Sequence, residues 1–238
     1  MSNFPFQRLQ AELAALISHS QGGQRLPSEP LLARQLGVSR ATLREAMRTF
    51  EAQGLIRRRQ GAGTFVVGHM AVLESGLEVL ESLDTMARRQ NLEVTVSDLQ
   101  VEQVFADQEH AEGLNVPLAS RLTRVRRVVR TGNRPVAYLV DTLPEEILRA
   151  DELPASFHGS VQDFLLDRGE NLATARANIS AIGASPDVAR ALEIQRGDVL
   201  LHFNTKIFDA TGRVVTFAFS YFIPGYFNFH VVRRVGGL

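Results

Sequence analysis

The sequence predicts two folded parts: a small head of three helices and a β-hairpin, and a larger α+β domain built around an antiparallel sheet. Apolar residues recur at helical spacing through most of the first 52 positions. Strand-like runs joined by a few short helical segments dominate the chain after residue 92. Charge divides in the same way: residues 1–68 carry nine arginines and four acidic residues, and their net charge of +5 is balanced by −5 on the remaining chain.

The first two helices of the head follow from apolar stripes and end signals. Residues 6–18 are expected to form a helix whose apolar face contains Phe6, Leu9, Leu13, Leu16 and Ile17. Ser28 can cap a second helix, which is expected to turn inward Leu31, Leu32 and Leu36. Gly37 ends this helix, because glycine takes the left-handed conformation of a helix end without a steric penalty.

A third helix and a hairpin complete the head. Ser39 can accept hydrogen bonds from the free N–H groups at the start of this helix. Its inward stripe contains Leu43, Met47 and Phe50, so several of its arginines must face water or a partner. Strand-like runs at 55–58 and 64–67 flank a turn at 60–63. Three short helices followed by a hairpin form a winged helix-turn-helix, whose third helix enters the major groove of DNA.

The larger part is expected to open with a helical stretch at 73–90 and to continue as a sheet. Strands are expected at 92–105, 121–131, 135–143, 173–181, 199–208, 214–222 and 227–233. Short helices are expected at 145–150, 160–168 and 186–192. This order of elements favours an α+β domain with an antiparallel sheet.

Composition excludes several classes of protein. Cysteine is absent, which excludes disulfides, cysteine nucleophiles and thiolate metal sites. No apolar run reaches 18 residues, and the first twenty residues lack a secretory hydrophobic region, so a cytoplasmic protein without membrane contact is expected. The six histidines show no metal-binding spacing, so neither a metal nor a cofactor is expected. The basic head instead indicates a polyanionic partner.

The run LPSEPLLARQLGVSRATLREAMRTFEAQGLIRRRQGAGTFV, residues 26–66, resembles the DNA-binding domain of GntR-family bacterial transcription regulators. The resemblance implies that Arg40 and Arg44 reach guanine edges or phosphates of double-stranded operator DNA. The whole set of DNA-binding residues that it implies is Ser39, Arg40, Thr42, Arg44, Arg58, Gln60, Gly61 and Gly63. Pro30 departs from the family, which usually has an arginine after LPSE, so that contact is lost or has moved to Arg34.

The remainder resembles the UTRA domain of the HutC subfamily through RPVAYLVDTLP, SVQDFLLDRG and ASPDVARALEIQRGDVLL. That resemblance implies a chorismate-lyase-like α+β fold that binds a small-molecule effector and joins two chains in a homodimer. The expected organisation is a head at 1–68, a linker at 69–73 and an effector-binding and dimerisation domain at 74–238.

The resemblance also indicates which residues line the effector pocket. Relatives that bind phosphosugars use two alternate arginines and a late glutamate; here these positions are Arg127, Val129 and Thr216. A pocket with one fewer arginine and no glutamate suits a less charged ligand than a phosphosugar. The residues expected to line the pocket are Arg127, His158, Ser160, Thr216 and Tyr221.

These features favour a ligand-responsive transcription regulator, most readily a repressor. A lyase-like enzyme is the alternative, because a fold can host both binding and catalysis, although the sequence offers no coherent catalytic set. An architectural DNA-binding protein would spread basic charge over the whole chain, and the acidic second part argues against it. The glycines around Ala62 join two strands, unlike a nucleotide-binding loop, which joins a strand to a helix.

Overall fold

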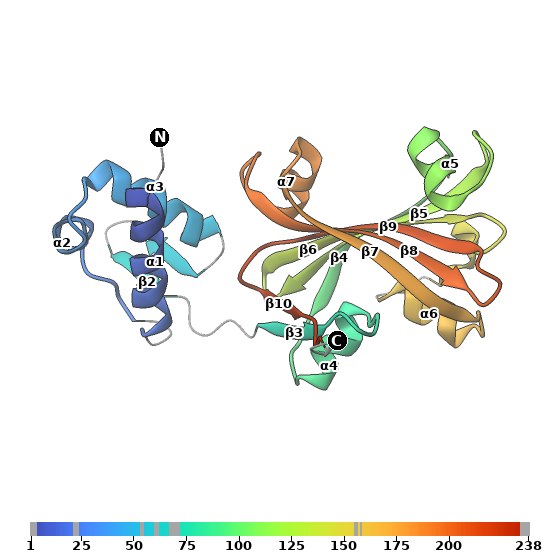
Figure 1. The fold of residues 1–238 in the computed structure, drawn as a ribbon, viewed down its shortest axis with the longest axis horizontal. Coiled ribbons are helices and arrows are strands. Elements are labelled where there is room, and N and C mark those ends of the chain that lie inside the picture. The colour runs from blue at the N-terminus through green and yellow to red at the C-terminus, as the bar shows by residue number, and fades with distance from the viewer. Residues whose placement is uncertain are drawn as a thin grey trace, which may run out of the picture. The chain divides into compact units, whose positions relative to one another are not determined.

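The computed structural model describes residues 4–20, 24–52, 55–59, 62–66, 72–154, 157 and 159–233. These residues belong to two compact units, 1–72 and 73–238 (Figure 1). The boundary lies within the linker expected at 69–73, of which positions 69–71 are outside the described residues. Leu73, expected in the linker, instead opens a strand.

The first unit is a winged helix-turn-helix, as the sequence predicts. Its elements are α1 (Phe4–Ser18), α2 (Glu29–Gln35), α3 (Arg40–Ala52), β1 (Ile56–Arg59) and β2 (Gly63–Val66). The two strands pair antiparallel, with Ile56 opposite Val66. The apolar faces of the helices meet in one core, in which Leu13, Leu43 and Met47 are at most 1% exposed.

One apolar residue of the head does not lie where the sequence predicts. Leu31, expected to face inward, is 46% exposed. The buried residues of α2 are Leu32 and Ala33. Neighbouring positions on a helix are rotated by about 100° around its axis, so the seven-residue helix turns Leu31 out when it turns these two residues in.

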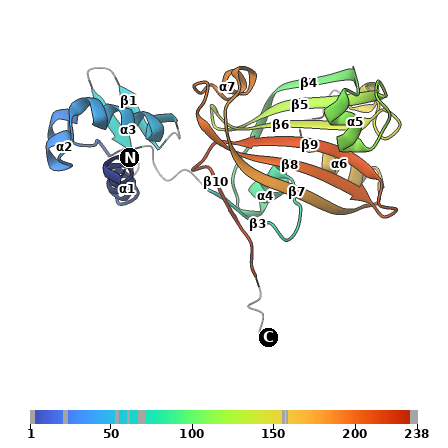
Figure 2. The same ribbon diagram turned by 45° about the horizontal axis from the view of Figure 1, so that its top comes forward.

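The second unit is built on a six-stranded antiparallel sheet with the order β4-β5-β6-β9-β8-β7 (Figure 2). Its strands are β4 (Thr95–Phe105), β5 (Arg121–Thr131), β6 (Arg134–Pro144), β7 (Leu172–Gly183), β8 (Val199–Asp209) and β9 (Val214–Phe222). A separate parallel pair joins β3 (Leu73–Gly76) to β10 (Phe227–His230). The first and last strands of this unit are therefore neighbours.

Four seven-residue helices and one 3₁₀ turn accompany the sheet. They are α4 (Leu83–Arg89), α5 (Gln108–Leu114), α6 (Val161–Asp167), α7 (Pro186–Leu192) and the turn at Ala150–Glu152. Helices this short are unstable alone, and each is capped by a side-chain oxygen, from Ser82, Asp107, Ser160 and Ser185 in turn. Helices α4 and α6 lie on one face of the sheet, called the inner face below, and α5 and α7 lie on the other, the outer face (Figure 1).

The structure corrects three predictions for this unit. The helix expected at 73–90 is a strand, β3, followed by a loop and α4, because residues 73–76 pair with β10. The helix expected at 145–150 is a turn, and the short 3₁₀ segment begins only at Ala150. Helix α5 was not expected. Its residue Gly113 packs closely against β9, because a Cβ atom at this position would lie 2.6 Å from the Phe217 ring.

Candidate DNA-binding surface and effector cavity

Helix α3 presents its polar side to solvent. Arg40, Thr42 and Arg44 are exposed, whereas Leu43 and Ala46 on the opposite side are fully buried. Ser39 precedes the helix, and its Oγ accepts the Thr42 N–H at 3.1 Å and lies 2.8 Å from the Thr42 hydroxyl. The Ser39 hydroxyl is therefore the cap of α3, and the exposed arginines are the longest side chains of this surface.

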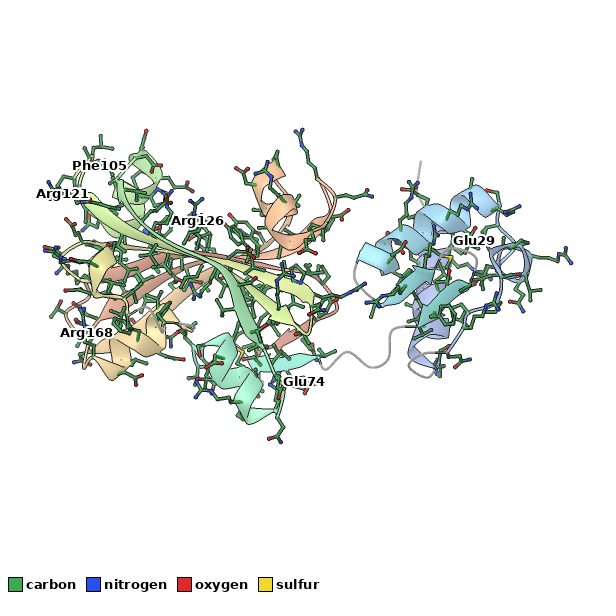
Figure 3. The ribbon with its side chains drawn as sticks, turned by 180° about the vertical axis from the view of Figure 1, so that it is seen from behind. Glu29, Glu74, Phe105, Arg121, Arg126 and Arg168 are labelled. Carbon is green, nitrogen blue, oxygen red and sulfur yellow. The ribbon has the colours of Figure 1, made fainter. Side chains whose placement is uncertain are left out.

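Glu29 links three elements of the head. Its carboxylate lies 2.6 Å from Arg44 Nε and 3.5 Å from the Arg58 guanidinium (Figure 3 labels Glu29). Arg58 also lies 3.7 Å from Glu51, whose carboxylate accepts the Arg58 backbone N–H at 3.2 Å. One acidic residue at the start of α2 thus holds an arginine of α3 and an arginine of the hairpin on one surface. Glu29 is not among the residues that the sequence predicts for this surface.

Gly63, one of the residues implied at the wing, is needed by the backbone itself. Its φ is +110°, and a Cβ atom there would lie 2.7 Å from Arg25 Nε. Arg25 also bridges Phe65 of β2. Gly63 therefore lets the Arg25 side chain pack against the hairpin. Gln60 and Gly61, predicted at the wing tip, lie outside the described residues.

We expect Gly63→Ala to lower the free energy of unfolding of the head by about 1–3 kcal/mol, because an alanine at this φ is strained and its Cβ atom would also displace the Arg25 side chain. Urea unfolding followed by far-ultraviolet circular dichroism measures the loss. Gly37→Ala is the matched control, since Gly37 also has a positive φ but open space around its Cβ position. A loss no larger than that of the control would contradict the close approach of Arg25.

The second unit contains a cavity of about 750 Å³ against the inner face of the sheet. Alternate residues of the sheet strands form its floor, because successive side chains of a strand point to opposite faces. The floor residues include Arg127, Val129, Leu139, Asp141, Phe203, Thr205, Ile207, Ala218, Ser220 and Phe222. Residues 75–84, which run from the end of β3 to the start of α4, form one wall, and Gly159, Ser160 and Gln162 at the start of α6 form another part of the lining.

Hydrogen bonds join these two walls of the cavity. Asp163 of α6 accepts from the Ser82 hydroxyl at 2.5 Å and from the Thr85 hydroxyl at 3.4 Å. The Gln162 side chain donates to the carbonyl of Leu80 at 3.0 Å. The wall formed by residues 75–84 is therefore attached to α6 as well as to β3.

An ion pair lies on the apolar floor. Arg127 is 5% exposed, and its Nη1 donates to Asp141 Oδ2 at 2.5 Å. Arg127 is directly opposite Leu139 in the sheet, so Asp141, two residues further along β6, lies diagonally across from it on the same face. A buried pair of opposite charges gives the floor polarity without net charge.

Comparison with known proteins decides the family. Residues 6–66 match bacterial regulatory proteins of the gntR family, and residues 89–228 match the UTRA domain, which alone covers more than half of the chain. The chain is a GntR-family transcription regulator. The head of this regulator is its DNA-binding domain, and its second unit is a UTRA domain of the type that binds small-molecule effectors.

Individual relatives agree with this assignment. The regulator is 32% identical over 218 residues to an HTH-type transcriptional regulator of Mycobacterium tuberculosis, covering 88% of this chain and 77% of the relative. It is 28% identical to the histidine utilization repressor of Pseudomonas aeruginosa, covering 88% and 84%. Among solved structures, PhnF from Mycobacterium smegmatis has the same fold, with a TM-score of 0.65, 21% identity and coverage of 96% and 100%. No described helix of the regulator is long and apolar enough to cross a membrane.

The predicted effector residues do not all come together. Arg127 and Ser160 line the cavity, and the Ser160 hydroxyl also caps α6 by accepting the Asp163 N–H at 3.2 Å. Thr216 is on the same strand as Ala218 and points to the same face, but it is buried and does not line the cavity. His158 lies outside the described residues.

The prediction that Tyr221 lines the effector pocket is wrong. Ser220 and Phe222 face the cavity, so Tyr221 between them points to the outer face. There its ring stacks on that of Tyr138, with the ring centroids 5.9 Å apart, and its centroid lies 4.9 Å from that of the His202 ring. Burial raises the pKa of both tyrosines and lowers the pKa of His202, so all three side chains are neutral at pH 7.

Among the cavity residues that the sequence does not predict are Asp141, Thr205 and Ser220. Asp141 stands within RPVAYLVDTLP, one of the segments that resemble the UTRA domain. An acidic residue in a largely apolar strand, as Asp141 is, can indicate a residue that contacts a ligand. Its pairing with Arg127 depends on the register of β5 and β6, which the pattern of one strand does not contain.

Proposed function

We propose that the regulator is a cytoplasmic repressor that leaves its operator when a small metabolite fills the UTRA cavity. One observation carries this proposal. Residues 75–84 line the cavity, and they begin only two residues after Leu73, where β3 opens next to the linker to the DNA-binding head. A ligand that moves this wall acts on the segment next to the head, and the size of the effect is limited by its preference for one conformation.

On the DNA side, we propose that Arg40 and Arg44 read base edges, with Thr42 beside them, and that Arg58 contacts phosphate. Gln60, Gly61 and Gly63 are proposed to bring the wing to the minor groove. A planar guanidinium matches both guanine and phosphate in bidentate fashion, and the exposed side of α3 carries two of them. The cavity is proposed to bind its ligand without transforming it, since its one buried charge pair is mutually neutralised.

Fluorescence anisotropy on DNA from the region upstream of the regulator's own gene tests this function. The labelled duplex and a scrambled duplex are titrated across a salt series. We expect the upstream duplex to bind more tightly, with an affinity that falls steeply with salt because phosphate contacts release counterions. Equal binding of the two duplexes would contradict operator recognition at that site.

We further propose that two chains associate through the outer face of the UTRA sheet. Two heads on a palindromic operator require a two-fold dimer. This face carries the half-buried rings of Tyr138, Tyr221 and His202, which contact one another, and Arg126 lies beside Tyr138 (Figure 3 labels Arg126). Aromatic and arginine side chains are the residues most enriched in protein interfaces, so this face suits a second copy of the chain.

Tyr221→Arg is expected to convert the dimer to a monomer, because a second copy would have to bury the new charge. Sedimentation velocity measures the oligomeric state. Leu118→Arg is the control, since Leu118 is 67% exposed in the loop after α5. Thermal unfolding of both variants checks that each remains folded. A Tyr221→Arg protein that sediments as a dimer would place the interface elsewhere.

A further inference from the structure

The charges around the cavity are unevenly distributed. Among the described residues that line it, Arg127 is the one cation, whereas Glu78, Glu81, Asp84 and Asp141 are acidic. Glu81 pairs with Arg89 at 2.8 Å and Asp84 pairs with Arg88, and neither of these arginines lines the cavity. The floor is neutral overall and the wall beside it is acidic. A phosphate group with two negative charges would meet more anions than cations here.

Arg127 has hydrogen-bonding capacity left over. A guanidinium has five N–H donors, and the bond to Asp141 is the one side-chain hydrogen bond of Arg127 to any described residue. Asp141 Oδ2 takes that bond, and Oδ1 accepts none from the described part of the chain. Neither residue has a polar side-chain atom that is both fully buried and without a partner, and both line the cavity, so a ligand in the cavity can reach the remaining groups. A ligand in the cavity is therefore favoured if it supplies an acceptor to Arg127 and a donor to Asp141.

Arg127 and Asp141 lie in different cross-strand rows of the sheet, so two different groups of one ligand can contact them. Arg127 lies in the cross-strand row of Leu139 and Ser220, and Asp141 lies in the neighbouring row of Ala218 and Thr205. Ser220 therefore lies in the same row as Arg127, two strands away, and Thr205 lies in the same row as Asp141, also two strands away. Apolar side chains of Val129, Phe203 and Phe222 also line the floor and provide a surface for an uncharged ligand body.

We propose that the effector is a zwitterion: a small molecule with a carboxylate that binds the open side of Arg127, an ammonium that binds Asp141, and an apolar body. This inference rests on the proposed effector role of the cavity. A carboxylate matches the guanidinium fork, and an ammonium has three donors of its own. A ligand with only one of the two charges leaves either Arg127 or Asp141 without its new partner. An α-amino acid or a short peptide end has the required chemistry.

The proposal is tested by calorimetric titration of the full-length protein without DNA. The proteinogenic amino acids are screened first by thermal shift. Each one that binds is compared with its deaminated acid and its decarboxylated amine, with glucose 6-phosphate, which has no ammonium group, as the dianionic probe. We expect the zwitterion to bind at least about ten-fold more tightly than either half, as charge-assisted contacts of one group imply. The phosphate ester is expected to show no binding.

Substitutions then assign each contact. Asp141→Asn should remove the preference for the amino acid over its deaminated acid, whereas Arg127→Gln should remove the preference over the decarboxylated amine. Asp187→Asn, which changes an exposed carboxylate of α7 outside the cavity lining, should leave both preferences unchanged. Circular dichroism confirms that the variants are folded, and the double variant Arg127→Gln/Asp141→Asn, which buries no unpaired charge, serves if a single variant unfolds.

Three results would overturn the proposal: equal binding of the deaminated acid, tighter binding of the phosphate ester, or no binding by any zwitterion of the panel up to about 10 mM, the limit of a meaningful affinity. Operator binding is measured separately by anisotropy. A protein that binds DNA but no zwitterion refutes the ligand class alone, whereas a protein that binds a zwitterion but no DNA refutes the proposed function.

Discussion

Arg44→Ala weakens operator binding by about 1–3 kcal/mol, roughly five- to 150-fold, and relaxes the base preference at one position of each half-site. The side chain of Arg44 is 54% exposed on α3, and Glu29 fixes its guanidinium at 2.6 Å. An arginine held in place loses less rotamer freedom when it binds a base edge. The substitution also leaves Glu29 without this partner, next to the proposed position of the DNA, and its negative charge adds to the loss.

Anisotropy on the operator and on duplexes with single base changes measures both effects. Arg48→Ala is the matched control, because Arg48 lies one turn further along α3, is 64% exposed and pairs with Glu45 at 3.1 Å. Its loss should be smaller and the same for all duplexes, as for a phosphate contact. The variant Glu29→Gln/Arg44→Ala separates the lost contact from the unpaired carboxylate. Unchanged base preference in Arg44→Ala would remove this residue from sequence readout.

Arg127→Met lowers the free energy of unfolding of the UTRA domain by about 3 kcal/mol, because it leaves the Asp141 carboxylate buried without its partner. The side chains of the pair are 6% and 14% exposed. The same variant should keep operator binding and lose the response to effector. Urea unfolding gives the stability, and anisotropy with added effector gives the response.

The double variant Arg127→Met/Asp141→Leu should regain most of the stability, since an apolar pair can replace a buried ion pair. It should not regain the effector response. Arg190→Met is the control for an exposed pair, because Arg190 and Asp187 are 79% and 87% exposed. We expect a change of about 0–1 kcal/mol there. A loss in Arg127→Met as small as in this control would mean that the cavity solvates Asp141.

The head could be predicted from sequence almost element by element because its signals are local. The stripe that contains Leu43 and Met47 and the cap at Ser39 all lie within a few positions of each other, and each fixes α3 without reference to distant residues. Exposed Leu31 shows the limit of this reasoning. In a helix of two turns, a one-residue rotation decides which leucine is buried.

The UTRA domain was less predictable because its decisive contacts are distant in sequence. Strand β3 exists because it pairs with β10, more than 150 positions later, and no pattern within residues 73–76 indicates that partner. Tyr221 was assigned to the wrong face because strand parity depends on a single residue. Asp141 became a site residue only when the register of β5 and β6 placed it diagonal to Arg127.

The pairing of β3 with β10 has a consequence during synthesis. The head is complete once residue 66 has left the ribosome, whereas the strand that follows the linker gains its partner only when residues 227–230 emerge. Domains fold in the order of their synthesis. A nascent or prematurely terminated chain therefore has a folded DNA-binding head before β3 of the UTRA domain has its partner strand. A chain that ends before residue 227 would lack the partner strand of β3, next to the linker.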